Sequence, residues 1–139
     1  MAKKPAAGKT LKPYVGSIEK DTMDNTFFRK VLFTAKNVQL VVMCLKPKED
    51  IGNEVHDAVD QFFRIEQGEA KFIFNNGKEE HVVKNGDAVI VTAGTWHNVV
   101  NNSEKDALKL YTLYSPPNHP DGRIQKTKAE AEAAEKAEH

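Results

Sequence analysis

The chain has 139 residues, and its 20 Lys and Arg residues balance 20 Asp and Glu residues, so the formal net charge is zero. This length corresponds to one domain with a sizeable core. Balanced charge gives no indication of a nucleic-acid or membrane-binding surface. No apolar run approaches the roughly 20 residues that a membrane helix needs, and no apolar segment of a secretory signal follows the basic N-terminus.

The single cysteine, Cys44, lies in an apolar run and has no partner for an internal disulfide. A chain without disulfides is typical of a reducing compartment, so we expect a cytoplasmic protein. The best interpretation of Cys44 itself is a small core residue rather than a nucleophile.

The two ends differ in composition from the body of the chain. Residues 1–13 are rich in Lys, Ala, Pro and Gly and are expected to form a flexible arm. Residues 14–118 form the expected domain, and residues 119–139 a partly helical extension. The helix is predicted from Thr127, a capping residue with Glu130 three positions later. Its segment has no apolar residue larger than Ala, so we expect a short, solvent-facing helix with a structural role.

The expected domain is a succession of short strands. Segments rich in β-branched and aromatic residues alternate with Gly- and Asn-containing turn signals, and no segment has a helical period long enough for a βαβ unit. This pattern predicts an all-β fold, a barrel or jelly roll of two antiparallel sheets. The predicted strands span residues 27–33, 38–45, 61–66, 70–74, 88–91, 96–100 and 108–114.

Four side chains in this pattern are candidate metal ligands. Glu54 and His56 are two positions apart, so in extended backbone they point to the same face. Gln61 lies on the next strand, where alternation sends its neighbour Asp60 to the opposite face. His97 lies on a later strand. Convergence of these four inside a barrel would give a site for a divalent metal.

The spacing around these residues resembles the first motif of the cupin superfamily. That motif runs Gly, five residues, His-x-His, three or four residues, Glu, six residues, Gly. His56 matches its second histidine and Gly68 its final glycine. Glu54 stands in place of the first histidine, and Gln61 in place of the glutamate.

A later segment resembles the second cupin motif, which runs Gly, five residues, Pro-x-Gly, two residues, His, three residues, Asn. Gly86, Gly94, His97 and Asn101 match it, and Thr92 replaces the proline. The resemblance covers roughly residues 27–114. It implies a single small cupin, a double-stranded β-helix opening at one end onto a metal site with an atypical Glu, His, Gln and His ligand set.

The ligand set suits one divalent ion per chain, Zn²⁺, Mn²⁺, Ni²⁺ or Fe²⁺, with Zn²⁺ favoured. Such an ion acts as a Lewis acid on an oxygenated substrate. We therefore expect a non-redox isomerase, epimerase or lyase acting on a sugar or a small keto or hydroxy acid. The zinc-dependent phosphomannose isomerases, also cupins, use the same ligand types in another order.

Two alternatives remain open at this stage. One is an iron-dependent dioxygenase, although such cupins usually carry three histidines and this chain has two at motif positions. The other is a binding module for a small molecule, which a missing general base would favour. None of Tyr111, Tyr114 and His119 can be assigned as that base. His119 lies in a proline-rich loop after the last strand, which could fold over the barrel mouth, although a surface position is favoured. His81 is expected on an exposed strand.

The resemblance also implies self-association, because small cupins commonly dimerise. Residues 27–33 carry more apolar material than one sheet face needs, and Phe62 should face away from the cavity. We expect a homodimer formed by sheet-to-sheet contact.

Overall fold

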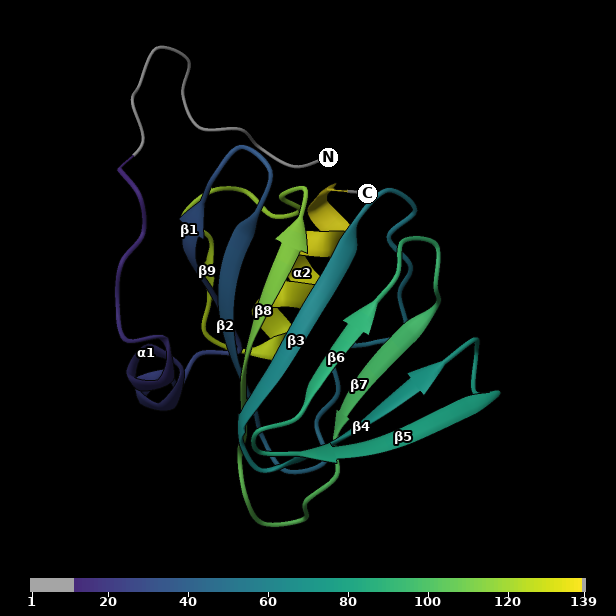
Figure 1. Cartoon of the computed structure of the whole chain (residues 1–139). Helices are drawn as coiled ribbons and strands as arrows, with labels where there is room; N and C mark the ends of the chain where they lie inside the picture. Colours follow the sequence, from purple (N-terminus) through teal and green to yellow (C-terminus); the bar gives the residue numbers. More distant parts are fainter. Residues whose placement is uncertain (1–11, 139) are drawn as a thin grey trace.

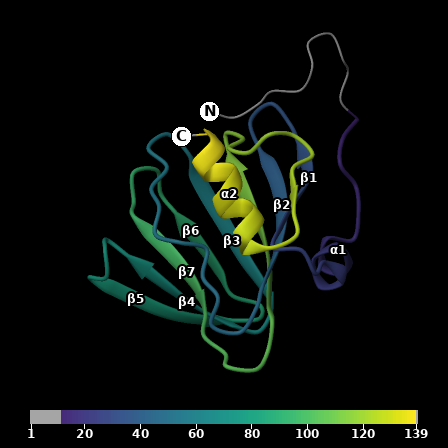
Figure 2. The same cartoon turned by 180° about the vertical axis from the view of Figure 1, so that it is seen from behind.

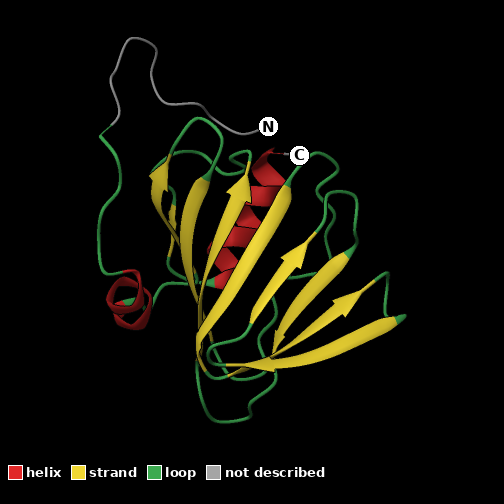
Figure 3. Ribbon diagram, in the orientation of Figure 1, coloured by secondary structure: helices red, strands yellow, loops and turns green. Residues whose placement is uncertain are grey.

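A computed structural model describes residues 12–138, in which nine strands and two helices are found (Figures 1 and 3). The predicted all-β fold of two antiparallel sheets is confirmed. The predicted strands are all present, with bounds that differ by a few residues. The strands are β1 (Arg29–Thr34), β2 (Gln39–Leu45), β3 (Asp60–Gln67), β4 (Glu69–Phe74), β5 (Glu79–Lys84), β6 (Ala88–Val91), β7 (His97–Asn101), β8 (Leu108–Ser115) and β9 (Ile124–Gln125).

The larger sheet has the strand order β6-β3-β8-β2-β1-β9, and the smaller has the order β5-β4-β7. Neighbouring strands pair antiparallel in both. The short strand β9, in the C-terminal extension, pairs with β1 and completes one edge of the larger sheet. The extension is therefore part of the barrel wall.

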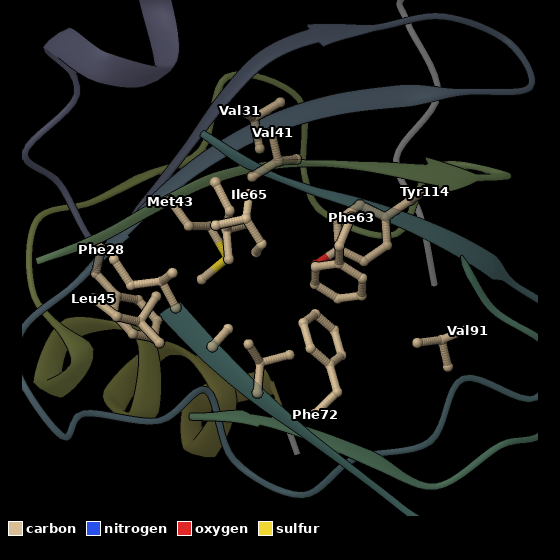
Figure 4. Close-up of a cluster of buried hydrophobic side chains, with 14 residues drawn as sticks. Phe28, Val31, Val41, Met43, Leu45, Phe63, Ile65, Phe72, Val91 and Tyr114 are labelled. Carbon is tan, nitrogen blue, oxygen red and sulfur yellow. The ribbon is translucent and has the colours of Figure 1, made fainter. Parts of the chain in front are cut away.

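The core lies between the inner faces of the two sheets. Alternation decides which residues enter it: on β3, Gln61, Phe63 and Ile65 are buried while their neighbours are less so. The rings of Phe63 and Phe72, one from each sheet, meet edge to face with centroids 5.0 Å apart (Figure 4). Such pairs stabilise a core beyond the area they bury.

The predicted turns place glycine where the backbone requires it. Gly68, between β3 and β4, has a φ of 96°, and a Cβ there would lie 3.0 Å from the carbonyl oxygen of Ala107. Any other residue would meet both backbone strain and a steric clash. The predicted hairpin between β4 and β5 turns at Asn76 and Gly77, both with positive φ.

The helix α1 (Ile18–Asp24) was not predicted. Its N-terminus is capped by Ser17, whose side chain accepts a hydrogen bond from the amide of Lys20. It packs against β8, β3 and β2. The expected flexible arm, residues 1–13, lies outside the described residues except for its last two.

The predicted C-terminal helix is present as α2 (Lys128–Glu138). The Thr127 hydroxyl accepts a hydrogen bond from the amide of Glu130, as the capping pattern predicts. The helix is not wholly solvent-facing, however. It crosses the inner side of the larger sheet (Figures 1 and 2), and Ala131 packs against the core. No helix among the described residues has the length and apolar character to cross a bilayer.

Candidate metal centre

The segment between β2 and β3 carries two candidate ligands and is held to the smaller sheet by its backbone. Isolated β-bridges join Asp50 to Val100 and Glu54 to His97, both on β7. The amides of Glu54 and His97 each donate to the other's carbonyl oxygen at 2.9 Å. The register of this bridge therefore places Glu54 directly beside His97.

Glu54, His56 and His97 form a cluster whose ligand atoms all lie within 4.8 Å of one another. The Glu54 Oε1 atom is 3.3 Å from Nε2 of His56 and 3.8 Å from Nε2 of His97. The two imidazole rings have centroids 5.5 Å apart. Three groups of these types at this spacing could hold a metal ion.

His97 is 2 % exposed, and its tautomer is fixed by the backbone. Its Nδ1 lies 2.9 Å from the carbonyl oxygen of Thr95, which can only accept, so Nδ1 carries the proton. The Nε2 lone pair is left for a ligand, the usual arrangement behind a metal-binding histidine. Burial lowers the pKa of His97, which keeps the ring neutral.

Glu54 is ionised in this cluster. Burial raises the pKa of its carboxyl, but the hydrogen bond and charge of His56, with the charges of Arg29 and His97, outweigh burial and lower the pKa below its usual value. A carboxylate between two imidazoles supplies the negative charge that a divalent ion requires.

Gln61 lies on β3 with its side chain in the interior, 2 % exposed. Its Nε2 donates to the Thr112 hydroxyl at 3.0 Å, and its Oε1 is buried without a hydrogen-bond partner. In register it pairs with Tyr114 of β8, whose ring lies 6.0 Å from the ring of His56. The predicted inward orientation of Gln61, and the outward one of Asp60, are confirmed.

A cavity of about 490 Å³ opens beside the cluster. Glu54 and His56 line it from the segment between β2 and β3, Arg29 from β1 and His119 from the loop before β9. The helix α2 closes the outer side. Its lining residues there are Lys128, Ala131, Glu132, Glu135 and Glu138.

The expectation that His119 lies at the surface is wrong. Its side chain is partly buried in the cavity wall, where Nε2 lies 3.1 Å from the Tyr114 hydroxyl. Gln39 positions the loop, because its Oε1 accepts from the amide of His119 and its Nε2 donates to the carbonyl oxygen of the same residue. Proline-rich composition indicates a loop but not the direction in which it folds, so no sequence signal predicts this contact.

Tyr114 and His119 form a pair whose proton positions are set by burial. Burial raises the pKa of Tyr114 to about 12, so the phenol stays protonated at neutral pH. Burial, with the charges of Arg29 and Arg123, lowers the pKa of His119 to about 2, so the imidazole stays neutral. Tyr111, by contrast, lies on the outer face with its ring centroid 6.2 Å from that of Phe62.

Arg29 was missed by the sequence analysis. It shares the inner face of β1 with Val31, and both are buried. A charged residue at an inward position of an apolar strand was the signal that could have identified it.

Comparison with known families decides the classification. The profile of the cupin domain matches residues 41–114, a stretch that includes both motifs. The chain belongs to the cupin family. The resemblance stated from the two motifs is thereby confirmed. The matched residues form the barrel described above.

Two relatives and one solved structure resemble this cupin over most of its length. Uncharacterized protein L612 of Acanthamoeba polyphaga mimivirus is 46% identical over 112 residues, which are 80% of this chain and 70% of that protein. Uncharacterized protein YrkC of Bacillus subtilis is 46% identical over 128 residues, which are 89% and 68%. The crystal structure of BH2720 from Bacillus halodurans superposes with a TM-score of 0.85 at 40% identity, covering 88% of this chain and 95% of that one.

Proposed function

We propose that this cupin binds one divalent metal ion through Glu54, His56, Gln61 and His97. The observation that carries the proposal is a set of ligand atoms turned to one point: Nε2 of His97 and Oε1 of Gln61 are buried without a hydrogen-bond partner, and Nε2 of His56 lies 3.3 Å from the Glu54 carboxylate. Buried polar atoms are nearly always satisfied, and unsatisfied ones beside a carboxylate fit a bound cation.

The donor set decides which ions suit the site. Two imidazole nitrogens, one carboxylate and one amide oxygen fit Zn²⁺, Mn²⁺, Ni²⁺ and Fe²⁺, and Zn²⁺ is our first choice. An ion bound there would act as a Lewis acid, polarising a carbonyl group or binding a substrate's hydroxyl or carboxylate oxygen.

We infer a non-redox reaction of the isomerase, epimerase or lyase type on a sugar or a small keto or hydroxy acid. Tyr114 keeps its proton at neutral pH, and its hydroxyl lies 3.1 Å from Nε2 of the neutral His119 ring, so the pair offers a hydrogen-bonding wall to the oxygens of a substrate. The loop of His119 and the helix α2 form part of the cavity wall. The carboxylate of Glu54 lies between the two histidines of the cluster, so we do not assign it the role of general base.

The first experiment is metal analysis of protein purified without an affinity tag. We expect close to one metal ion per chain in the natural protein, and loss of tight binding in His56→Ala and in His97→Ala. His81→Ala is the matched control, because His81 lies exposed on β5, where its ring meets Glu79 and the ring of Phe74 away from the cluster. Stoichiometric metal in the double variant of His56 and His97 would refute the site.

The second experiment follows turnover of the metal-loaded protein on a panel of keto acids, hydroxy acids and sugars. Product formation that His56→Ala and His97→Ala abolish would support the enzyme. A full metal complement without turnover on any member would favour a binding module. One observation favours the binding module: the phenol of Tyr114 is protonated at neutral pH, so it cannot act there as the general base of an enzyme.

A further inference from the structure

The cavity holds a buried cation without a counterion. Arg29 is 7 % exposed, and its side chain lines the cavity that Glu54 and His56 also line. Its Nη1 donates to Oε1 of Gln125 at 2.7 Å, and its guanidinium stands 5.3 Å from the centre of the Phe28 ring. Its Nε is buried without a hydrogen-bond partner.

The other cations of the cavity wall are paired. Arg123 forms an ion pair with Glu138, and Lys128 forms one with Asp50. Arg29 has no carboxylate partner within ion-pair distance anywhere in residues 12–138. Glu54 lies near enough for the charge of Arg29 to help lower its pKa, but not near enough to pair.

A buried charge without a partner costs several kcal/mol, so its retention requires a compensating interaction. Gln125 supplies one neutral oxygen and no charge. A bound divalent ion would add positive charge to the same cavity, and Glu54 alone would not balance it. The cavity therefore favours an anionic ligand.

The guanidinium also indicates the kind of anion. Its planar set of donors matches a carboxylate, which accepts two parallel hydrogen bonds. The Gln125 amide fixes one end of the group and the Phe28 ring lies beside it, so its orientation is set before a ligand arrives. A cavity of about 490 Å³ accommodates a small organic acid.

The carboxylates of α2 are the competing partners for Arg29. Glu132 and Glu135 line the outer part of the cavity, but both are exposed and neither pairs with Arg29. The helix thus leaves the guanidinium accessible from the cavity.

We propose that Arg29 is the carboxylate receptor of this cavity, so that the ligand is a small organic acid rather than a neutral sugar. This inference names the ligand class for the proposed function. It rests on the proposed function in one respect, that the metal ion binds the other end of the ligand. Arg29 fixes the carboxylate, and the remaining oxygens lie toward Glu54 and His56.

The test uses two pairs of probes that differ in charge but little in shape: lactate with lactamide, and gluconate with sorbitol. Binding to the metal-loaded protein is measured by calorimetry. We expect at least one acid to bind about tenfold or more tightly than its neutral counterpart, which is the usual effect of a hydrogen bond to a charged group. Equal binding within both pairs, or no binding of either acid, would overturn the proposal without any substitution.

Variants then assign the preference to one residue. Arg29→Gln should abolish the preference for acids, and Arg29→Lys should keep part of it, because it retains charge without the planar donor set. Arg64→Gln is the matched control, since Arg64 lies on β3 beside Glu66, with its side chain 43% exposed. An undiminished preference in Arg29→Gln would refute the assignment.

Metal content measured on the same samples separates this inference from the proposed function. Arg29→Gln should bind as much metal as the natural protein. If neither the natural protein nor Arg29→Gln binds metal, the proposed function fails. The probes are then titrated into the protein without metal, where a preference for acids that depends on Arg29 would still establish the receptor.

Discussion

Glu54 and His97 hold each other in place through their backbones: each amide donates to the other's carbonyl oxygen at 2.9 Å, while their side chains meet at the candidate metal centre. One carboxylate and one imidazole are thus positioned by a β-bridge between two segments far apart in sequence. A backbone bridge of this kind positions the two groups as the chain folds, so the cost of organising them is met by folding.

Gln61 is the weakest of the four candidate ligands, because its donor atom is a neutral amide oxygen. We predict that metal affinity depends on which residue replaces it. Gln61→Ala should weaken metal binding less than His97→Ala does, because water can replace a neutral amide oxygen. Gln61→Glu should tighten it, because a carboxylate adds charge. Competition with a chelator measures these affinities.

The control for these variants is Gln67→Ala on the same strand, where the amide donates to the carbonyl oxygen of Ala107 outside the site. Metal affinity should be unchanged there. Unchanged affinity in both Gln61 variants would remove Gln61 from the ligand set.

Local pattern was sufficient to predict much of the barrel. Alternation on β3 placed Gln61 inside and Asp60 outside, and the same rule placed His97 inside and Trp96, 42 % exposed, outside. The alternation of side chains along a strand is a local property, so it can be predicted without knowing which strands lie beside it.

The rest of the site depends on contacts between distant segments. His119 reaches the cavity because Gln39, 80 positions earlier, binds its backbone, and α2 covers the cavity because Lys128 pairs with Asp50. Composition alone assigned both segments to the surface. The missed role of Arg29 has the same origin, since an inward cation is understood only when its surroundings are known.

Asn101, at the last position of the second motif, is predicted to stabilise the fold. It is fully buried, and its Nδ2 approaches the carbonyl oxygens of Leu45, Lys46 and Asp106 within 3.1 Å. Asn101→Ala leaves buried acceptors unsatisfied and should lower the free energy of unfolding by about 2–4 kcal/mol. Urea denaturation measures the change, and Asn102→Ala, a less buried neighbour, should cost far less.

The attachment of α2 over the cavity should depend on pH. Burial raises the pKa of Asp50, but hydrogen bonds from Lys128 and Asn98 outweigh burial and lower the pKa below its ordinary value of 3.8. A carboxyl whose pKa is lower when folded stabilises the protein above its unfolded pKa, and this contribution is lost as the pH falls through the folded pKa.

We therefore expect the attachment of α2 to weaken in acid, below about pH 3.8. The ion pair is partly exposed, so its contribution to the free energy of attachment is at most about 1 kcal/mol. Hydrogen exchange at the backbone amides of residues 128–138, compared with the intrinsic rate at each pH, reports the detachment. In Asp50→Asn these amides should be less protected throughout, with a weaker dependence on pH. Identical pH profiles in the two proteins would contradict this account.

The outer face of the larger sheet is predicted to form a homodimer contact. Ile90, Phe62 and Leu113 lie side by side across β6, β3 and β8, and Ile90 is 66 % exposed. A row of partly exposed apolar side chains on a sheet face marks an interaction surface. Static light scattering should give twice the chain mass of 15.5 kDa at micromolar concentration.

Phe62→Glu should shift this equilibrium toward the monomer, because the dimer would bury a charge without a partner. Val82→Glu is the matched control, since Val82 is an exposed apolar residue on β5 of the other sheet. Circular dichroism excludes unfolding as the cause. A monomeric mass for the natural protein would contradict the dimer outright, and an unchanged dimer in Phe62→Glu would move the contact away from this face.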